Sequence, residues 1–390
     1  MPRRPDRPKP RKAAAVAPPQ RATTGPRPRR RRLLAAAALL GVAAAVAAWA
    51  LAGEDPATLR ARAEAASKAE DWPTALRCFE ALNRSAVADA DSRLGEARAL
   101  LALGRAAQAE RVLIRGCQAD PTRPEPWLLR LELLHMEDRP VEAARVGWEA
   151  YEAVAPPRRR EVLKVLTTAL LAEEPDALVR STLKRWAAAD PDDLDAEAAL
   201  LRRIAPEPHL GDPDVADRLK TLEIRLARDP SHVGVREALV QTLADAGDPD
   251  RGRMLLDSWP RSSRDARYDR LRGRWSLDYD ADPALAVDHL RRALAEVPHD
   301  WKTRYRLARA LRLLNRDADA RRESDTVALL RDLLSPRLLG PRLDADLSRL
   351  DDPRSLLDLS SLCSSAGLAR LAQAWRQEAE AMRRAGGVQP

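Results

Sequence analysis

Small residues return to the same positions of this chain every 34 residues, beginning at Pro56. In consecutive blocks that start at positions 56, 90 and 124, the twentieth position is always alanine, namely Ala75, Ala109 and Ala143. A period of 34 residues is the length of a unit of two antiparallel helices, and a small residue at a fixed position lets the two helices approach closely. The pattern therefore predicts a stack of helix pairs.

The same register returns in a second run of blocks that start at positions 233, 267 and 301. Ala286 and Ala320 occupy the twentieth positions there, and Pro298 occupies the thirty-second, where the second helix must end because proline cannot continue it. Gly104 and Gly247 fall where the first helix of a unit ends and the second is about to begin, which is typical of a helix C-terminus. Two separate stretches of the chain thus predict the same unit.

Composition limits the secondary structure to helix. Alanine, leucine and arginine are abundant, whereas aromatic residues make up 4% of the chain, so helix is favoured over strand. A chain of 390 residues is too long for one compact core, but a solenoid has no such limit because each unit packs on its neighbours. We therefore expect an all-α solenoid of about nine helix pairs.

The register breaks at two places. The fifth block runs over 192–232, which is 41 residues, and three prolines and a glycine at 205–213 forbid a continuous helix. Ser-Pro and Gly-Pro steps interrupt 335–352. We predict repeats over 53–334 with a surface loop at 205–213, an irregular joint over 335–352 with a short helix at 343–350, and a final capping pair over 353–386 whose last helix has a charged outer face.

A membrane segment is predicted before the repeats. Residues 33–52 contain no charge and consist mostly of alanine and leucine. At about 1.5 Å per residue, such a helix just crosses a hydrocarbon core of roughly 30 Å. Four arginines precede the segment and two acids follow it, so the positive-inside rule places the N-terminus in the cytoplasm. We predict a single-pass anchor in the inner membrane with the repeats outside the cytoplasm. Cleavage after Ala52, which would release a secreted protein, and burial of the segment in a soluble protein are the alternatives.

Positive charge is concentrated ahead of this segment. Residues 1–32 contain ten Arg and two Lys against one acid, a net charge of +11, so the overall +8 leaves −3 for the rest of the chain. This Pro-rich tail is expected to be disordered. It could bind anionic lipid headgroups or contact nucleic acid without sequence preference, or it could serve only to set the topology. The repeats have no basic stripe, so we expect no nucleic-acid recognition there.

The sequence lacks the motifs of common enzymes. It has no phosphate loop, dinucleotide fingerprint, nucleophile elbow or zinc-protease motif. The histidines are scattered, and His289 is interpreted as a packing or surface residue. Cys78, Cys117 and Cys363 show no metal-binding spacing, and the first two lie too far apart for a disulfide. The acids at 190–193 resemble a turn and a helix start. We therefore expect no catalytic residue, cofactor or metal.

From position 56 to 386 the pattern resembles the tetratricopeptide repeat (TPR) family. The resemblance rests on small, apolar and proline residues in two blocks: Leu94, Ala97, Leu100, Gly104, Ala109, Leu113 and Pro121, and Leu307, Ala308, Leu311, Ala320 and Val327. It departs from the family where an aromatic residue is usual, because only Trp127 and Phe79 are aromatic at those positions. The family implies a right-handed superhelix whose first helices line a concave groove for peptides or partner proteins. The layout also resembles membrane-tethered repeat proteins of bacteria.

Positions 2, 5, 9 and 12 of each first helix face the groove in this repeat geometry. In the seventh and eighth units these positions form what we call the predicted groove wall: Tyr268, Trp275, Lys302, Tyr305, Arg309 and Arg312. Aromatic and arginine side chains anchor partners well, and arginine can bind a carboxylate through two donors. The wall predicts an acidic protein or peptide partner. Alternatively, Trp275 or Tyr305 packs against the next repeat.

These observations predict a membrane-anchored scaffold that binds a partner protein or extended peptide in the groove. The alternative is an accessory assembly factor for an envelope enzyme system, such as polysaccharide or cytochrome maturation. The sequence shows no separate catalytic domain, which favours the scaffold.

Overall fold

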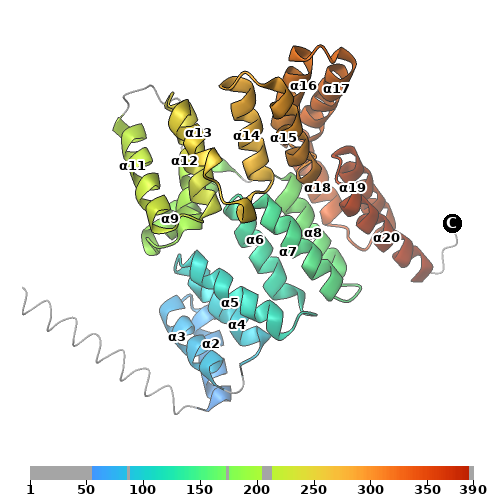
Figure 1. Ribbon diagram of the computed structural model, residues 1–390. Helices are drawn as coiled ribbons and strands as arrows, with labels where there is room; N and C mark the ends of the chain where they lie inside the picture. The colour runs from blue at the N-terminus through green and yellow to red at the C-terminus, as the bar shows by residue number, and fades with distance from the viewer. Residues whose placement is uncertain (1–54, 86–87, 173–174, 204–212, 386–390) are drawn as a thin grey trace, which may run out of the picture. The chain divides into compact units, whose positions relative to one another are not determined.

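The computed structural model describes residues 55–85, 88–172, 175–203 and 213–385, which belong to one compact unit (Figure 1). This part of the chain contains nineteen α-helices, one 3-10 turn and no strand, which confirms the all-α class. The helices are α2 (Pro56–Lys68), α3 (Trp72–Arg84), α4 (Ala90–Ala102), α5 (Ala106–Ala119), α6 (Pro124–Met136), α7 (Pro140–Ala153), α8 (Arg159–Leu171), α9 (Asp176–Ala189), α10 (Leu194–Arg203), α11 (Pro213–Arg228), α12 (Val233–Asp245), α13 (Pro249–Asp257), α14 (Ala266–Asp278), α15 (Pro283–Glu296), α16 (Trp301–Leu313), α17 (Asp317–Leu333), α18 (Pro336–Leu347), α19 (Pro353–Ser365) and α20 (Ala369–Ala385).

The expected tail over 1–32 and the expected membrane segment over 33–52 lie outside the described residues, as does the loop at 205–213 except for its last residue. Among the residues that are described, no helix combines the length and the apolarity that a membrane crossing requires.

The 34-residue register agrees with the observed helices. The first helix of each predicted unit begins within two residues of the expected position, from Pro56 of α2 to Pro353 of α19. Local chemistry explains these starts. An aspartate side chain accepts a backbone N–H of the first turn at many of them, as Asp300 does from Thr303 N at 3.0 Å, and proline often occupies the first turn, as Pro56 does, where no N–H partner is lost.

One backbone feature repeats in every regular unit. The fifteenth residue of a unit ends the turn between its two helices, and it has a positive φ, between 52° and 81°, in seven units: Glu70, Gly104, Asp138, Gly247, Ala281, Asn315 and Gly367. A positive φ is the left-handed conformation that closes a helix C-terminus, and glycine adopts it without a steric penalty. The glycines that the sequence analysis placed at this turn therefore have the predicted role, and four other residue types adopt the same conformation.

The twentieth position is the point where the helices of a unit meet. Ala75, Ala109, Ala143, Ala286 and Ala320 are all buried there, as the sequence predicts. In the sixth unit this position is Gly252, where an added Cβ would lie 2.2 Å from Cζ2 of Trp275. The small residue at this position therefore makes room for a large side chain from the next unit.

The stack of helix pairs is interrupted in the fourth unit. Its two helices separate: α8 packs against α6, α7 and α20, whereas α9 packs against α10 (Figure 1). This arrangement corrects the expectation of a continuous solenoid in which each unit packs only on its sequence neighbours. Each of the two helices therefore packs against these neighbours and not against the other.

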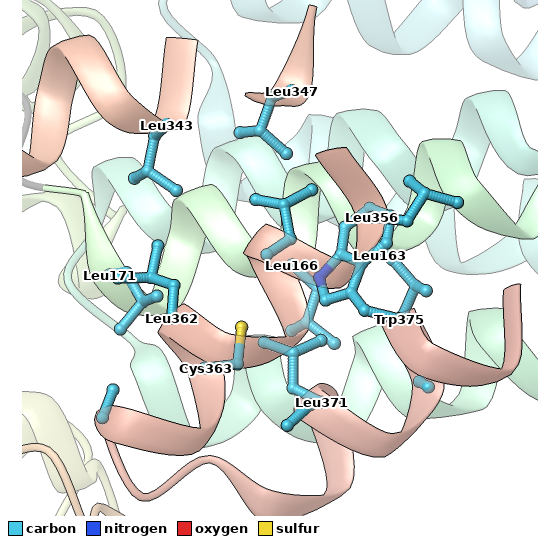
Figure 2. Packing of buried hydrophobic residues seen from close by; sticks show 14 of the residues in the cluster. Leu163, Leu166, Leu171, Leu343, Leu347, Leu356, Leu362, Cys363, Leu371 and Trp375 are labelled. Atoms are coloured by element: carbon cyan, nitrogen blue, oxygen red, sulfur yellow. The ribbon is translucent and has the colours of Figure 1, made fainter. Parts of the chain in front are cut away.

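The last helix returns to the middle of the chain. Trp375 of α20 is fully buried in a core that also contains Leu163 and Leu166 of α8, and its Nε1 donates a hydrogen bond to Thr167 Oγ1 at 3.0 Å (Figure 2). Arg370 of α20 forms an ion pair of 2.7 Å with Glu152 near the end of α7. The pair of α19 and α20 was expected to cap the repeats, but α20 instead bridges back to α8.

A second long-range contact joins the turn before α10 to the second unit. Asp193 accepts a hydrogen bond from Ala107 N at 2.9 Å, in the first turn of α5, and another from Ala196 N at 3.0 Å. An added Cβ on Gly104 would lie 2.8 Å from the Cβ of Ala189. The acids at this turn therefore cap helices, as the sequence analysis interpreted them, but one of the helices that they cap is distant in sequence.

The joint predicted over 335–352 is more regular than expected. Helix α18 occupies Pro336–Leu347, in place of the short helix expected at 343–350. Proline starts this helix favourably, and the helix continues through Pro341 although proline removes one helical hydrogen bond. Leu339, Leu343 and Leu347 recur every four residues and are buried in the core that contains Trp375, which explains the longer helix.

Candidate functional site

The structure divides the predicted groove wall into a buried part and an exposed part. Tyr268 and Trp275, on α14, are buried in a core with Trp259 and Leu256. Trp275 fills the space left by Gly252, and its Nε1 donates to Pro249 O at 3.0 Å. These two aromatic side chains pack between units and are not exposed to a partner, which corrects their assignment as anchors.

The remaining four residues lie together on α16. Lys302, Tyr305, Arg309 and Arg312 are all exposed there, and Tyr305 keeps 56% of its surface open to solvent. Leu313, one position beyond Arg312, is 58% exposed. We call these five residues the α16 face. They recur at spacings of three, four and eight residues, which places them on one side of the helix.

Leu313 was not predicted from the sequence. A signal was present, because Leu313 lies four residues after Arg309 and eight after Tyr305, which places all three in one line along the helix. The position was overlooked because the family pattern puts groove residues at positions 2, 5, 9 and 12, whereas Leu313 is at position 13.

The α16 face is predominantly positive. Arg309 forms an ion pair of 2.7 Å with Asp278 of α14, and Arg312 donates to Ser324 Oγ of α17 at 2.6 Å. Behind the face, burial and the nearby charge of Arg274 lower the pKa of Arg306. The five residues of the face thus include three cations and no acid, which favours an anionic group there.

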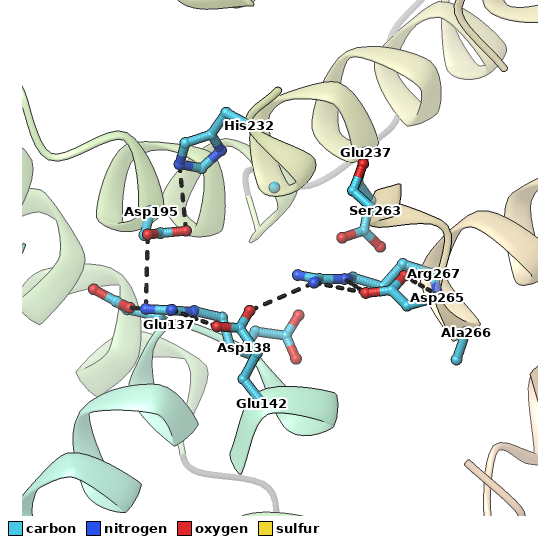
Figure 3. A network of polar contacts seen from close by, with 12 residues as sticks. Glu137, Asp138, Glu142, Asp195, His232, Glu237, Ser263, Asp265, Ala266 and Arg267 are labelled. Carbon is cyan, nitrogen blue, oxygen red and sulfur yellow. Dashed lines mark hydrogen bonds and ion pairs between the residues drawn. The ribbon is translucent and has the colours of Figure 1, made fainter. Parts of the chain in front are cut away.

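A network of buried ion pairs lies apart from this face and was not predicted from the sequence (Figure 3). Its centre is Arg139, in the turn between α6 and α7, which is 2.7 Å from Glu137, 2.8 Å from Glu110 and 2.5 Å from Glu142. Two further members, Asp195 and Arg267, lie at longer distances from their partners. The members of the network come from α5, the turn between α6 and α7, α7, α10 and α14. We call it the Arg139 network: Glu110, Glu137, Arg139, Glu142, Asp195 and Arg267.

The Arg139 network has a structural role. Arg267 of α14 lies 3.4 Å from Glu142, and Asp195 of α10 lies 3.6 Å from Arg139 and 3.5 Å from His232. Burial alone would raise the pKa of Asp195, but His232 and Arg139 lower it to about 2. Burial alone would lower the pKa of Arg139, but Glu142, Asp195 and Glu137 raise it. The charged groups of the network therefore stabilise one another, and they join units that are distant in sequence.

The histidine and cysteine side chains that could take part in catalysis or metal binding are buried by packing. His289 is buried between α14 and α15, where Nδ1 lies 2.6 Å from Asp269 Oδ1. Burial raises the pKa of the Cys117 and Cys363 thiols to about 12, so both are protonated at neutral pH and are poor nucleophiles. Within the described ranges, no group of three or more His, Cys, Asp or Glu side chains is arranged to hold a metal ion.

Comparison with known proteins gives matches among solved structures alone. No family model matches the chain, and no curated protein matches it. A tetratricopeptide repeat protein from Parabacteroides merdae has a TM-score of 0.31 and 11% identity, over 66% of this chain and 98% of that one. The Cut9-Hcn1 hetero-tetramer of APC/C has a TM-score of 0.31 and 13% identity, over 86% and 80%.

Human IFIT1, solved as a dimer with PPP-AAAA, has a TM-score of 0.36 and 14% identity, over 78% of this chain and 70% of that one. Identities and TM-scores as low as these carry no argument about this chain. The assignment of a repeat architecture therefore depends on the helix pairs of the chain itself.

Proposed function

We propose that this protein is an interaction scaffold whose α16 face binds an acidic, extended segment of a partner protein. The observation that carries the proposal is the exposure of Tyr305 and Leu313 beside Lys302, Arg309 and Arg312 on a single helix. Large apolar side chains exposed on one side of a helix among cations are a combination that partner binding explains, since apolar contacts supply affinity and charges supply orientation.

The charges support an acidic partner. Residues 301–350 contain twelve Lys and Arg against seven Asp and Glu, a net charge of +5, whereas the chain after position 32 carries −3 overall. Arg309 and Arg312 are held by one partner each, Asp278 and Ser324, and both are exposed. A carboxylate from a partner can therefore bind either guanidinium without breaking a buried contact.

The test is a selection of displayed peptides against the full-length chain, followed by titration of the selected peptides. We expect acidic sequences that contain an apolar residue. Arg309→Ala and Arg312→Ala should each weaken binding by about 1.5 to 3 kcal/mol, because each removes a charge-assisted hydrogen bond. Added salt should weaken binding to the native chain more than binding to either variant.

Arg322→Ala is the matched control, since Arg322 is an exposed arginine on the neighbouring helix α17 and is paired with Asp319. It should leave the affinity unchanged, and thermal melts of all three variants should match that of the native chain. Selected peptides without acidic residues, or equal affinity in Arg309→Ala and the native chain, would contradict the proposal.

We also propose that residues 33–52 anchor the scaffold in a membrane with the repeats outside the cytoplasm. The proposal rests on the uncharged run of twenty residues, with four arginines before it and two acids after it. The basic tail, with its net charge of +11, would then lie against anionic headgroups on the cytoplasmic side, at about 1 kcal/mol per basic residue near the surface.

Reporters fused after residue 390 test this topology. Alkaline phosphatase should be active, and a fluorescent protein that matures only in the cytoplasm should be dark. Deletion of 33–52 should reverse both signals. Inactive phosphatase together with bright fluorescence in the undeleted chain would refute the topology and leave the binding proposal for the α16 face intact.

A further inference from the structure

An open groove lies over α12, between α11 and α13. It shares no residue with the α16 face. Its volume is about 400 Å³. The walls are mostly apolar, and Met254 of α13 is 63% exposed at its edge. We call it the α11–α13 groove and define it by the residues that matter here: Leu226, Arg236, Leu239, Leu243, Met254 and Leu255.

Arg236 is the unusual member of this lining. Only 6% of its surface is exposed, and its guanidinium donates to neutral groups: Pro230 O at 2.7 Å, and Leu255 O and Ser258 Oγ at 3.3 Å each. The guanidinium carbon lies 5.9 Å from the centre of the Trp259 ring. The Nε–H of Arg236 is buried and has no hydrogen-bond partner.

Arg236 is buried as a cation without an anion. Within the described part of the chain it forms no ion pair with a carboxylate, and burial lowers its pKa. The other two buried arginines of the described residues are paired, Arg130 with Glu110 at 3.3 Å and Arg139 with Glu137 at 2.7 Å. A buried charge is costly unless it is paired, and arginine does not lose its proton in proteins.

The acidic residue that lines this groove already has an ion-pair partner. Glu223 of α11 forms an ion pair with Arg251 of α13 at the rim, where both side chains are exposed. Arg251 also lies 3.3 Å from Asp248, so it is paired twice at the rim, whereas Arg236 has no carboxylate partner among the described residues. The groove thus offers apolar walls together with one unneutralised, partly desolvated guanidinium.

We propose that the α11–α13 groove binds a medium-chain fatty acid, with the apolar chain along the leucines and Met254 and the carboxylate on Arg236. A carboxylate supplies the missing counter-charge and can accept two hydrogen bonds from a guanidinium. The volume of about 400 Å³ is within the range of small-molecule sites, which are mostly apolar with a few polar groups that fix orientation.

Octanoate is the probe, and methyl NMR of the full-length chain is the measurement. The chain has four methionines, so labelling of the methionine methyl groups gives a simple spectrum, and Met254→Leu assigns the groove signal. Octanoate should shift the Met254 signal and leave those of Met136 in α6 and Met382 in α20 unchanged. Octanol should bind at least about tenfold more weakly, and octylamine should not bind, because neither supplies an anion.

Arg236→Met should weaken octanoate binding by about ten- to a hundredfold and abolish the preference for octanoate over octanol. Arg251→Met is the matched control, because it removes a guanidinium from the rim that is already paired, and it should keep the preference. If Arg236→Met does not fold, the comparison of the three probes on the native chain decides the proposal.

Equal binding of octanoate and octanol to the native chain would overturn the proposal, as would an unmoved Met254 signal. The same loss in Arg251→Met as in Arg236→Met would also overturn it. Tighter binding of an acetylated trileucine with a free carboxyl end than of octanoate would assign the groove to a peptide terminus and refute a fatty acid.

Discussion

Trp375→Ala is expected to lower the free energy of unfolding by about 3 to 5 kcal/mol, the range for removing a large aromatic side chain from a core. Trp375 is fully buried, and its core joins α20 to α8 across about two hundred residues of sequence. The substitution leaves a cavity and also removes the hydrogen bond from Nε1 to Thr167 Oγ1. Trp375→Phe should cost less, because it keeps most of the apolar contact.

The measurement is denaturant unfolding of the full-length chain together with hydrogen exchange of the α8 amides. Arg376→Ala, at the exposed position next to Trp375, is the control and should change stability by less than about 0.5 kcal/mol. The contact between α20 and α8 would be refuted if Trp375→Ala unfolded at the same midpoint as Arg376→Ala, or if exchange in α8 stayed at its native rate.

Arg139→Met is expected to cost about 3 to 5 kcal/mol, the range for breaking a buried ion pair by removing one partner. Glu137 has almost no exposed surface, so without Arg139 it must stay buried as an unpaired carboxylate or take up a proton at neutral pH. Either outcome destabilises the folded chain. Glu110, Glu142 and Asp195 lose the same partner.

A double-mutant cycle tests the cause. Glu137→Gln should recover part of the loss when it is combined with Arg139→Met, since an amide is less costly to bury than a carboxylate. Arg145→Met is the control, because Arg145 pairs with Glu149 on the exposed side of α7 and such pairs contribute about 0.5 kcal/mol or less. Additive losses in the double mutant would show that Arg139 is not coupled to Glu137. Equal losses in Arg139→Met and Arg145→Met would show that the network contributes no more stability than an exposed ion pair.

The geometry of the candidate site was predicted in part, and its binding role stays a prediction. The helical spacing of Lys302, Tyr305, Arg309 and Arg312 placed them on one face, and the structure leaves that face open. Trp275 has an equivalent position in its own unit but is buried against Gly252. The position in the repeat determines the direction in which a side chain points. The size of the residue across the interface determines whether that side chain is covered.

The two unpredicted features, the Arg139 network and the lone cation Arg236, depend on burial. Arginine is frequent throughout the sequence, so an arginine at position 139 or 236 does not by itself indicate burial. Burial of both results from helices that are brought together by the fold. The pairing of one and the isolation of the other are therefore tertiary properties.

The sequence by itself determined the unit of this protein: helix pairs with a 34-residue period, alanine where the helices meet and a left-handed residue at position 15, as at Gly104. These features depend on residues close together in the chain, so their spacing is visible in the sequence. Only the tertiary structure decided that α8 separates from α9 and that α20 packs on α8. Those contacts require complementary surfaces on helices far apart in sequence, and the fit of Trp375 among the leucines of α8 has no period that the sequence could reveal.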